Sequence, residues 1–210
     1  QSLAAVQYHD DYPYASSHKE VSKRGRIEST TLPGDVYQDH SSSIEYDVNT
    51  LGIPQLVVNE NGFCVQGEYP IGSLRVITTI DADGKKQTKM LDMYDKTIVA
   101  RIGNNLDTYY IYDDLGNLRY ILPPAITSQL TNNNNYNDGD DLIRNYAYVY
   151  RYDKYGNLIY KRLPGAEENY MVYDKAGRLV LQQDGNQRTR GNLWLMTKYG
   201  VIVNSVFVSR

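Results

Sequence analysis

The stretch Tyr-Arg-Tyr-Asp-Lys-Tyr-Gly-Asn-Leu-Ile-Tyr at residues 150–160 returns at residues 110–120 with the same residue at seven of its eleven positions. A third copy covers residues 171–180, and its aspartate follows that of the copy before it by 21 residues. Residues 91–99 form a degenerate copy that lacks the glycine. Self-similarity at a fixed period of this length is typical of repeat architectures. We therefore expect a chain built from one repeated supersecondary unit.

Each copy has the composition of a β-hairpin. The aspartate that opens the four-residue connection accepts hydrogen bonds from backbone amides two residues on, and the glycine that closes it supplies a positive φ. The tyrosines before the turn and the leucine after it alternate as strand residues do. We therefore expect a structural, turn-forming role for the repeated acidic and glycine positions, which are Asp113, Gly116, Asp153, Gly156, Asp174 and Gly177.

Tyrosine dominates the aromatic content: 21 of the 210 residues are tyrosine, against two phenylalanines and one tryptophan. Tyrosine suits a half-buried pleated surface, because its ring packs while its hydroxyl stays hydrated. The sequence therefore predicts an all-β fold, an antiparallel sheet of consecutive β-hairpins. Outside the repeats it predicts a hairpin turn at residues 59–62, a brief helix at residues 124–130, and strands at residues 44–48, 55–58, 63–66 and 74–80.

The chain divides by composition into three segments. Residues 1–30 are expected to be a polar, weakly structured lead-in, residues 31–75 a β segment of short strands, and residues 76–210 the hairpin region. Inside the last segment, residues 131–141 are polar and low in complexity, so we expect a mobile surface loop there. Residues 201–208 form an apolar strand. Such a strand either pairs within the sheet or causes self-association with a second chain.

The charge pattern excludes several classes of function. The chain has 22 basic and 25 acidic residues with a net charge of −3 and a pI of about 5.6, whereas nucleic-acid binding requires a clustered basic surface. No apolar run approaches the roughly 18 residues that cross a bilayer, and residues 1–20 lack the order of a signal peptide. The single cysteine, Cys64, and three scattered histidines fit neither a metal site nor a nucleophile with its base. We therefore expect no catalytic residues, no metal and no cofactor.

The motif Tyr-Asp-x-x-Gly-Asn/Arg-Leu, at residues 112–118, 152–158 and 173–179, resembles the repeats of the YD-repeat (Rhs-type) proteins of bacteria. The resemblance implies a sheet of stacked hairpins that curls and, in complete members, closes into a shell around a variable C-terminal domain. Three or four hairpins are too few to close a shell, so we expect a short, partly curled ribbon. The resemblance also implies a bacterial surface or secreted protein, with an extracellular or cell-surface location and the signal peptide removed.

The leading hypothesis is a non-enzymatic β-scaffold segment with a structural or interaction role, whose partner is a glycan or another domain of the same parent chain. The alternative is a carbohydrate-binding module, because aromatic faces on a rigid sheet are good platforms for sugar rings. Its candidate ligand-binding residues are Tyr112, Tyr120, Tyr150, Tyr152, Tyr160, Tyr173 and Trp194. Cross-strand packing within the sheet explains the same tyrosines. A weaker alternative is a glycan-active enzyme built on two distant carboxylates.

Overall fold

Strands dominate the computed structural model of the chain, which describes residues 11–131, 134–199 and 205–209. Strands account for 47% of the structure and helices for 10%, and most of the strands belong to a large antiparallel sheet that is not closed. The predicted all-β fold of antiparallel hairpins is therefore confirmed. The chain divides into two compact units, and each contains both local hairpins and pairings between segments far apart in sequence.

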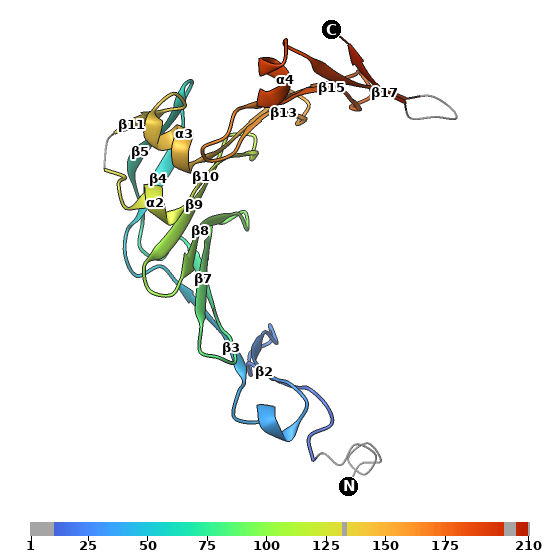
Figure 1. Ribbon diagram of the computed structural model, residues 1–210. Helices are drawn as coiled ribbons and strands as arrows, with labels where there is room; N and C mark the ends of the chain where they lie inside the picture. Colours follow the sequence, from blue (N-terminus) through green and yellow to red (C-terminus); the bar gives the residue numbers. More distant parts are fainter. Residues whose placement is uncertain (1–10, 132–133, 200–204, 210) are drawn as a thin grey trace. The chain divides into compact units, whose positions relative to one another are not determined.

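The first unit comprises residues 1–53 and 69–107. Its strands pair antiparallel in the order β1-β2-β3-β6-β7-β8 (Figure 1). Met90 and Val99 are paired neighbours on its buried face, where the Thr78 and Thr88 hydroxyls form a hydrogen bond of 3.1 Å. The elements are β1 (Ser16–Lys19), β2 (Ile27–Thr31), the 3-10 helix η1 (Asp35–Tyr37), β3 (Ser42–Val48), β6 (Arg75–Ile80), β7 (Lys86–Leu91) and β8 (Thr97–Ile102).

The hairpin of β1 and β2 lies in the segment for which the sequence predicts a weakly structured lead-in. The two strands pair antiparallel, and the Arg26 guanidinium makes two hydrogen bonds, of 3.0 and 2.8 Å, to the carboxylate of Glu20 in the connecting turn. Most side chains of this hairpin are exposed. Backbone hydrogen bonds and the Arg26–Glu20 ion pair therefore stabilise it more than burial of apolar side chains does. The predicted segment boundaries at residues 30 and 75 stay a prediction.

A buried asparagine fixes the point where the chain leaves β3. Asn49 Oδ1 accepts a hydrogen bond from the backbone N–H of Leu74 (2.8 Å), and its Nδ2 donates to the carbonyl oxygens of Leu51 and Pro70 (2.9 Å each). Asn49 is only 3% exposed and Leu74 only 1%. Because each polar atom of the Asn49 side chain is hydrogen-bonded, its burial is tolerated.

The second unit comprises residues 54–68 and 108–210. It contains consecutive hairpins in the strand order β9-β10-β12-β13-β14-β15-β16-β17 and a three-stranded sheet in the order β11-β5-β4. Its elements are β4 (Ile53–Val58), β5 (Gly62–Tyr69), β9 (Leu106–Tyr112), β10 (Leu118–Leu122), α2 (Pro124–Thr127), β11 (Asn135–Asn137), α3 (Asp141–Tyr146), β12 (Tyr148–Tyr152), β13 (Leu158–Arg162), β14 (Asn169–Tyr173), β15 (Leu179–Gln183), α4 (Gly185–Thr189), β16 (Trp194–Lys198) and β17 (Ser205–Ser209).

The core of the second unit gathers side chains from the three-stranded sheet, the hairpins and the two short helices α2 and α3. Phe63, Ile126 and Ile143 are each 0% exposed. The centroid of the Phe63 ring lies 5.1 Å from that of Tyr120 and 5.1 Å from that of Tyr136. The Phe63 and Tyr136 rings are stacked, with an angle of 19° between their planes. Aromatic pairs at such distances stabilise by about 0.5–1.5 kcal/mol beyond the area that they bury.

The structure corrects one local expectation, the mobile loop at residues 131–141. Residues 135–137 form β11, which pairs antiparallel with β5, and α3 begins at Asp141. The pairing joins residues more than 70 positions apart, such as Tyr136 and Phe63. A polar run of this kind carries no local strand signal, because the strand forms only against its distant partner.

The other predicted elements lie close to their places. Three predicted strands fall within β3, β4 and β5, a fourth starts one residue before β6, and the predicted helix contains α2 with a proline at its start. The turn at Asn59 and Gly62 closes the β4–β5 hairpin with a backbone hydrogen bond of 3.0 Å. At the apolar tail, β17 pairs antiparallel with β16. Residues 201–204 lie outside the described residues, and self-association stays a prediction.

Candidate functional site

The repeated turn is held by the same four hydrogen bonds in each copy. At Asp113, the backbone N–H donates to the carbonyl oxygen of Asn117 (3.0 Å), and the Gly116 N–H donates to that of Asp113 (2.8 Å). Asp113 Oδ1 accepts hydrogen bonds from the N–H groups of Leu115 (3.1 Å) and Asn117 (2.8 Å). The same pattern occurs in four further turns, which begin at Asp81, Asp92, Asp153 and Asp174. These are the bonds that a turn-forming role predicts.

The residue after the glycine adds a bond that the sequence alone did not indicate. Asn157 Nδ2 donates to Asp153 Oδ2 at 2.9 Å, and Arg178 Nε donates to Asp174 Oδ2 at 2.8 Å. The Asn157 side chain lowers the pKa of Asp153, and the backbone N–H and guanidinium of Arg178 lower the pKa of Asp174. Such carboxylates are ionised acceptors at neutral pH, so they are poor general acids. The recurrence of Asn or Arg at this position of the motif is the signal from which the bond could have been predicted.

The candidate tyrosines are divided between the two faces of the sheet. Tyr112 on β9 and Tyr150 and Tyr152 on β12 share one face, because Tyr110 and Tyr148 both pair with Ile121. Tyr120 and Tyr160 belong to the opposite face, since Tyr120 pairs with Val149 and Tyr160 with Arg151. The structure therefore does not bring the candidate residues into one aromatic platform.

The tyrosine rings are substantially buried. Tyr120 is 0% exposed, and Tyr160 makes an edge-to-face contact with Tyr170 at 5.5 Å. Burial raises the pKa of Tyr150, Tyr152 and Tyr160. Tyr112, Tyr173 and Trp194 are half-buried. This is the geometry of cross-strand packing, and a ligand-binding role for these residues stays a prediction.

A partly buried polar network joins β10, β12 and the segment after β11. The Tyr120 hydroxyl donates to Asp138 Oδ1 (2.7 Å), and Arg151 Nη2 donates to the Tyr120 hydroxyl (2.6 Å) and pairs with Asp138 Oδ2. Arg162 Nη2 donates to the Asp138 carbonyl oxygen at 2.7 Å. Burial raises the pKa of Tyr120, and the hydrogen bond to Asp138 adds to this effect. The network anchors Asp138.

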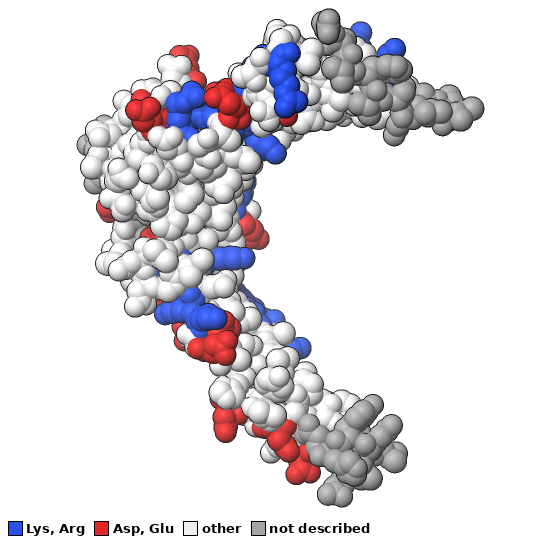
Figure 2. Space-filling model, viewed as in Figure 1, with Lys and Arg blue, Asp and Glu red and all other residues white. Residues whose placement is uncertain are grey.

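Charges of both signs lie side by side in the second unit. The Glu168 carboxylate has three arginines around it, Arg144 at 3.7 Å, Arg162 at 3.9 Å and Arg188 at 3.2 Å. The face shown in Figure 2 has basic and acidic side chains interspersed there. A surface of mixed charge does not form the single-sign patch that steers nucleic acid.

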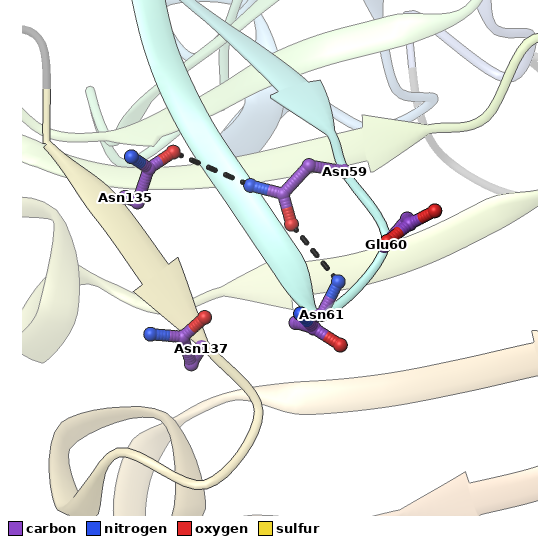
Figure 3. Close-up of a pocket in the computed structure, with 5 residues that line it drawn as sticks. All are labelled: Asn59, Glu60, Asn61, Asn135 and Asn137. Carbon is purple, nitrogen blue, oxygen red and sulfur yellow. Dashed lines mark hydrogen bonds between the residues drawn. The ribbon is translucent and has the colours of Figure 1, made fainter.

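A polar hollow of about 480 Å³ lies between the tip of the β4–β5 hairpin and β11 (Figure 3). We call it the asparagine pocket, and its lining residues are Asn59, Glu60, Asn61, Asn135 and Asn137. Two sequence segments contribute to it, and Asn59 Nδ2 donates across the hollow to Asn135 Oδ1 at 3.4 Å. Sequence reasoning assigned Asn59 and Asn61 to a turn and the other asparagines to a loop, so it missed the pocket.

Little in the described part of the chain has the geometry of a reactive centre. Across residues 11–131, 134–199 and 205–209, no group of three or more His, Cys, Asp or Glu residues is placed to hold a metal ion. Cys64 is a free, half-buried thiol. The described helices include none that is long and apolar enough to span a membrane.

No family model and no curated protein matches the chain. Among solved structures, it is similar to a chain in the crystal structure of TcdB2-TccC3-TEV, with 14% sequence identity and a TM-score of 0.45. The match covers 92% of this chain and 10% of that chain, so the present chain spans about a tenth of its length. A likeness at this distance carries no argument about function.

Proposed function

We propose that this chain is a non-enzymatic β-scaffold segment of the YD-repeat (Rhs-type) class, with a structural or interaction role in a bacterial surface or secreted protein. The observation that supports this most directly is the recurrence of one turn, with the same hydrogen bonds to one aspartate, in five hairpins among the described residues. Carboxylates that stabilise the turns of the sheet in this way fit a structural role. The partners that fit this role are a glycan or another domain of the same parent chain.

The hydrogen bonds that the acidic residues accept support the non-enzymatic part of the proposal. Asp153 and Asp174 accept hydrogen bonds from backbone N–H groups and from the side chain four residues on, which leaves little capacity for proton transfer. The half-buried Asp138 is held by Tyr120 and Arg151. A glycosidase needs two carboxyl groups that face one substrate with different pKa values. The carboxylates of the repeats instead each accept the same two backbone hydrogen bonds within their own turn.

A carbohydrate-binding module that uses exposed aromatic residues remains the second candidate. Tyr155, at the tip of the β12–β13 hairpin, is 78% exposed, and Tyr94, at the corresponding tip in the first unit, is 73% exposed. Exposed rings at hairpin tips are accessible to sugar rings. These tips are better placed for binding than the half-buried tyrosines that the sequence favoured.

Two experiments test the proposal. The purified chain is incubated with chromogenic glycoside, ester, phosphoester and peptide substrates, and no turnover is expected with any of them. Turnover that is lost in an Asp153→Asn or Asp138→Asn variant would contradict a non-enzymatic role. Protease treatment of intact bacterial cells that express the natural gene tests the location, because a surface protein is degraded while a cytoplasmic control survives.

A glycan array with the purified chain tests the second candidate. Binding that disappears in a Tyr94→Ala/Tyr155→Ala variant would favour the carbohydrate-binding module over a purely structural scaffold. An array that stays blank would remove the module and leave the scaffold.

A further inference from the structure

The asparagine pocket presents side-chain amides that the protein itself does not use. Within the described residues, the carboxamides of Asn61 and Asn137 and the carboxylate of Glu60 make no hydrogen bond, and all three residues are exposed. Figure 3 shows Asn59 and Asn61 in the turn of the β4–β5 hairpin, and Asn135 and Asn137 at the two ends of β11. Each carboxamide offers an acceptor oxygen and two N–H donors.

The backbone beneath these amides is firmly held. Gly62 lies so close to β11 that a Cβ atom on it would come within 1.8 Å of the Tyr136 carbonyl oxygen. The Asp138 N–H donates to the Asn61 carbonyl oxygen at 2.9 Å, and Phe63 stacks on Tyr136 below. The two walls of the pocket therefore keep their spacing without a ligand. Because the backbone on both sides of the pocket is fixed, binding of a ligand costs chiefly side-chain entropy.

The charge of the pocket selects against ions. Among the described residues, its lining has no basic side chain and a single carboxylate, that of Glu60. Phosphate or carboxylate ligands would meet a like charge with no arginine or lysine to balance it. A hard cation such as Ca²⁺ takes six to eight oxygen ligands, usually with several carboxylates among them. The lining thus fits a neutral ligand.

The hydrogen-bonding groups of the pocket narrow the class of ligand further. Neighbouring hydroxyl groups on a sugar ring each donate and accept, which matches the paired donors and acceptors of a carboxamide. The volume of about 480 Å³ is within the range of small-ligand sites. Since none of the described residues that line the pocket has an aromatic ring, affinity depends on the amides and not on stacking.

We propose that the asparagine pocket binds a neutral sugar residue of a glycan through the side-chain amides of Asn61 and Asn137. This site is separate from the candidate tyrosines and from the repeated aspartate turns. It does not depend on the scaffold role, because a chain with either function can carry it.

The test uses the full chain, labelled with ¹⁵N, and follows its asparagine side-chain amide signals by NMR. The probes are glucose, galactose, mannose and N-acetylglucosamine, with glucuronate and galacturonate as charged counterparts of the first two. The expected result is saturable shifts of the Asn61 and Asn137 Nδ2 signals with at least one neutral sugar. A uronate should bind about tenfold or more weakly than its neutral counterpart.

Two variants make the result specific. Asn61→Ala/Asn137→Ala should weaken binding by about tenfold or more, which corresponds to about 1.4 kcal/mol. The matched control, Asn104→Ala/Asn105→Ala, removes two exposed asparagines from a turn of the first unit and should leave binding unchanged. Should the double variant lose its dispersed backbone spectrum, Asn61→Ala alone decides, because Asn61 has no positive φ that alanine would strain.

Three outcomes would overturn the proposal. One is the absence of saturable shifts with every neutral sugar, another is equal binding in the wild-type chain and the Asn61→Ala/Asn137→Ala variant, and the third is tighter binding of a uronate than of its neutral counterpart. None of them bears on turnover or cell-surface location, so failure here is distinguishable from failure of the scaffold proposal.

Discussion

Asp95 occupies, in the turn that begins at Asp92, the place that Gly116 occupies in the turn that begins at Asp113. Its φ is +64°, against +83° for Gly116, and its N–H donates to the carbonyl oxygen of the turn aspartate in the same way. A non-glycine residue in this region is strained, although aspartate tolerates it better than most. The repeat is therefore complete in backbone geometry where it is degenerate in sequence.

Replacement of Asp95 by glycine is expected to stabilise the chain. Relief of strain gains about 1 kcal/mol, and the greater freedom of glycine in the unfolded chain reduces the net gain to about 0.5 kcal/mol. The ion pair of Asp95 with Arg75 is lost, but both side chains are more than half exposed, so this loss is small. The measurement is urea unfolding of Asp95→Gly beside the wild-type chain. The control, Asp114→Gly, places glycine in a repeat turn at a position without positive φ, and it should destabilise. A destabilised Asp95→Gly chain would refute the equivalence of the two positions.

The turns were predictable because all their determinants lie within five consecutive residues. Asp153 supplies the acceptor, Gly156 the positive φ and Asn157 the donor, and each of these roles follows from the chemistry of a single residue type. The alternation of side chains along each strand was also predictable, since it is local. Which tyrosines share a face of the sheet was not, because this depends on strand register, and the register shifts beside the turns of β9–β10, β12–β13 and β14–β15 are set by pairing.

The asparagine pocket was not predictable, because its two walls are far apart in the chain. Asn59 and Asn135 are 76 residues apart, and the only apolar residue of β11 is Tyr136. The residues that hold β11, including Tyr120 and Arg151, belong to strands that looked like ordinary repeats. Long-range pairing of a polar strand leaves no periodic signal in a single sequence.

Stability should fall in acid as the turn carboxylates are protonated. In the folded chain the pKa values of Asp153 and Asp174 lie below the ordinary aspartate value of 3.8. Their contribution to stability is therefore present at pH above the unfolded pKa and is lost as pH falls through the lower, folded pKa. The urea midpoint is expected to be constant near neutral pH and to decline below about pH 4.

A matched pair of variants tests whether Asp153 and Asp174 cause this loss of stability. Asp153→Asn/Asp174→Asn keeps the Oδ1 acceptors but removes the titrating groups, so the decline should become shallower. Lys154→Gln changes an exposed charge in the turn of Asp153 without altering a carboxylate, and it should keep the full decline. An unchanged decline in the aspartate variant would show that other carboxylates dominate acid unfolding.

Removal of one hydroxyl should loosen β11 from the second unit. Tyr120→Phe deletes the donor to Asp138 and the acceptor of Arg151 while keeping the buried ring, and the expected cost is about 1–2 kcal/mol. Tyr150→Phe is the control, because its hydroxyl makes no hydrogen bond within the described residues, and it should change stability by less than about 0.5 kcal/mol. Hydrogen exchange of the β11 amides is expected to accelerate in the first variant alone. Equal exchange in both would assign the anchoring of β11 to other contacts.

The close approach of β5 and β11 gives the sharpest test of how the second unit is assembled. In Gly62→Ala the new Cβ atom would lie 1.8 Å from the Tyr136 carbonyl oxygen, a backbone atom that cannot rotate away, so β11 must separate from β5. Forced overpacking of this kind typically costs about 1–3 kcal/mol. Gly139→Ala is the matched control, because nothing lies within 4 Å of its Cβ position and its φ is not positive. The measurement combines urea unfolding with hydrogen exchange at residues 135–137, and loss of protection there is expected only in Gly62→Ala. Retained protection in that variant would mean that β11 is held chiefly by Asp138 and its partners rather than by its pairing with β5.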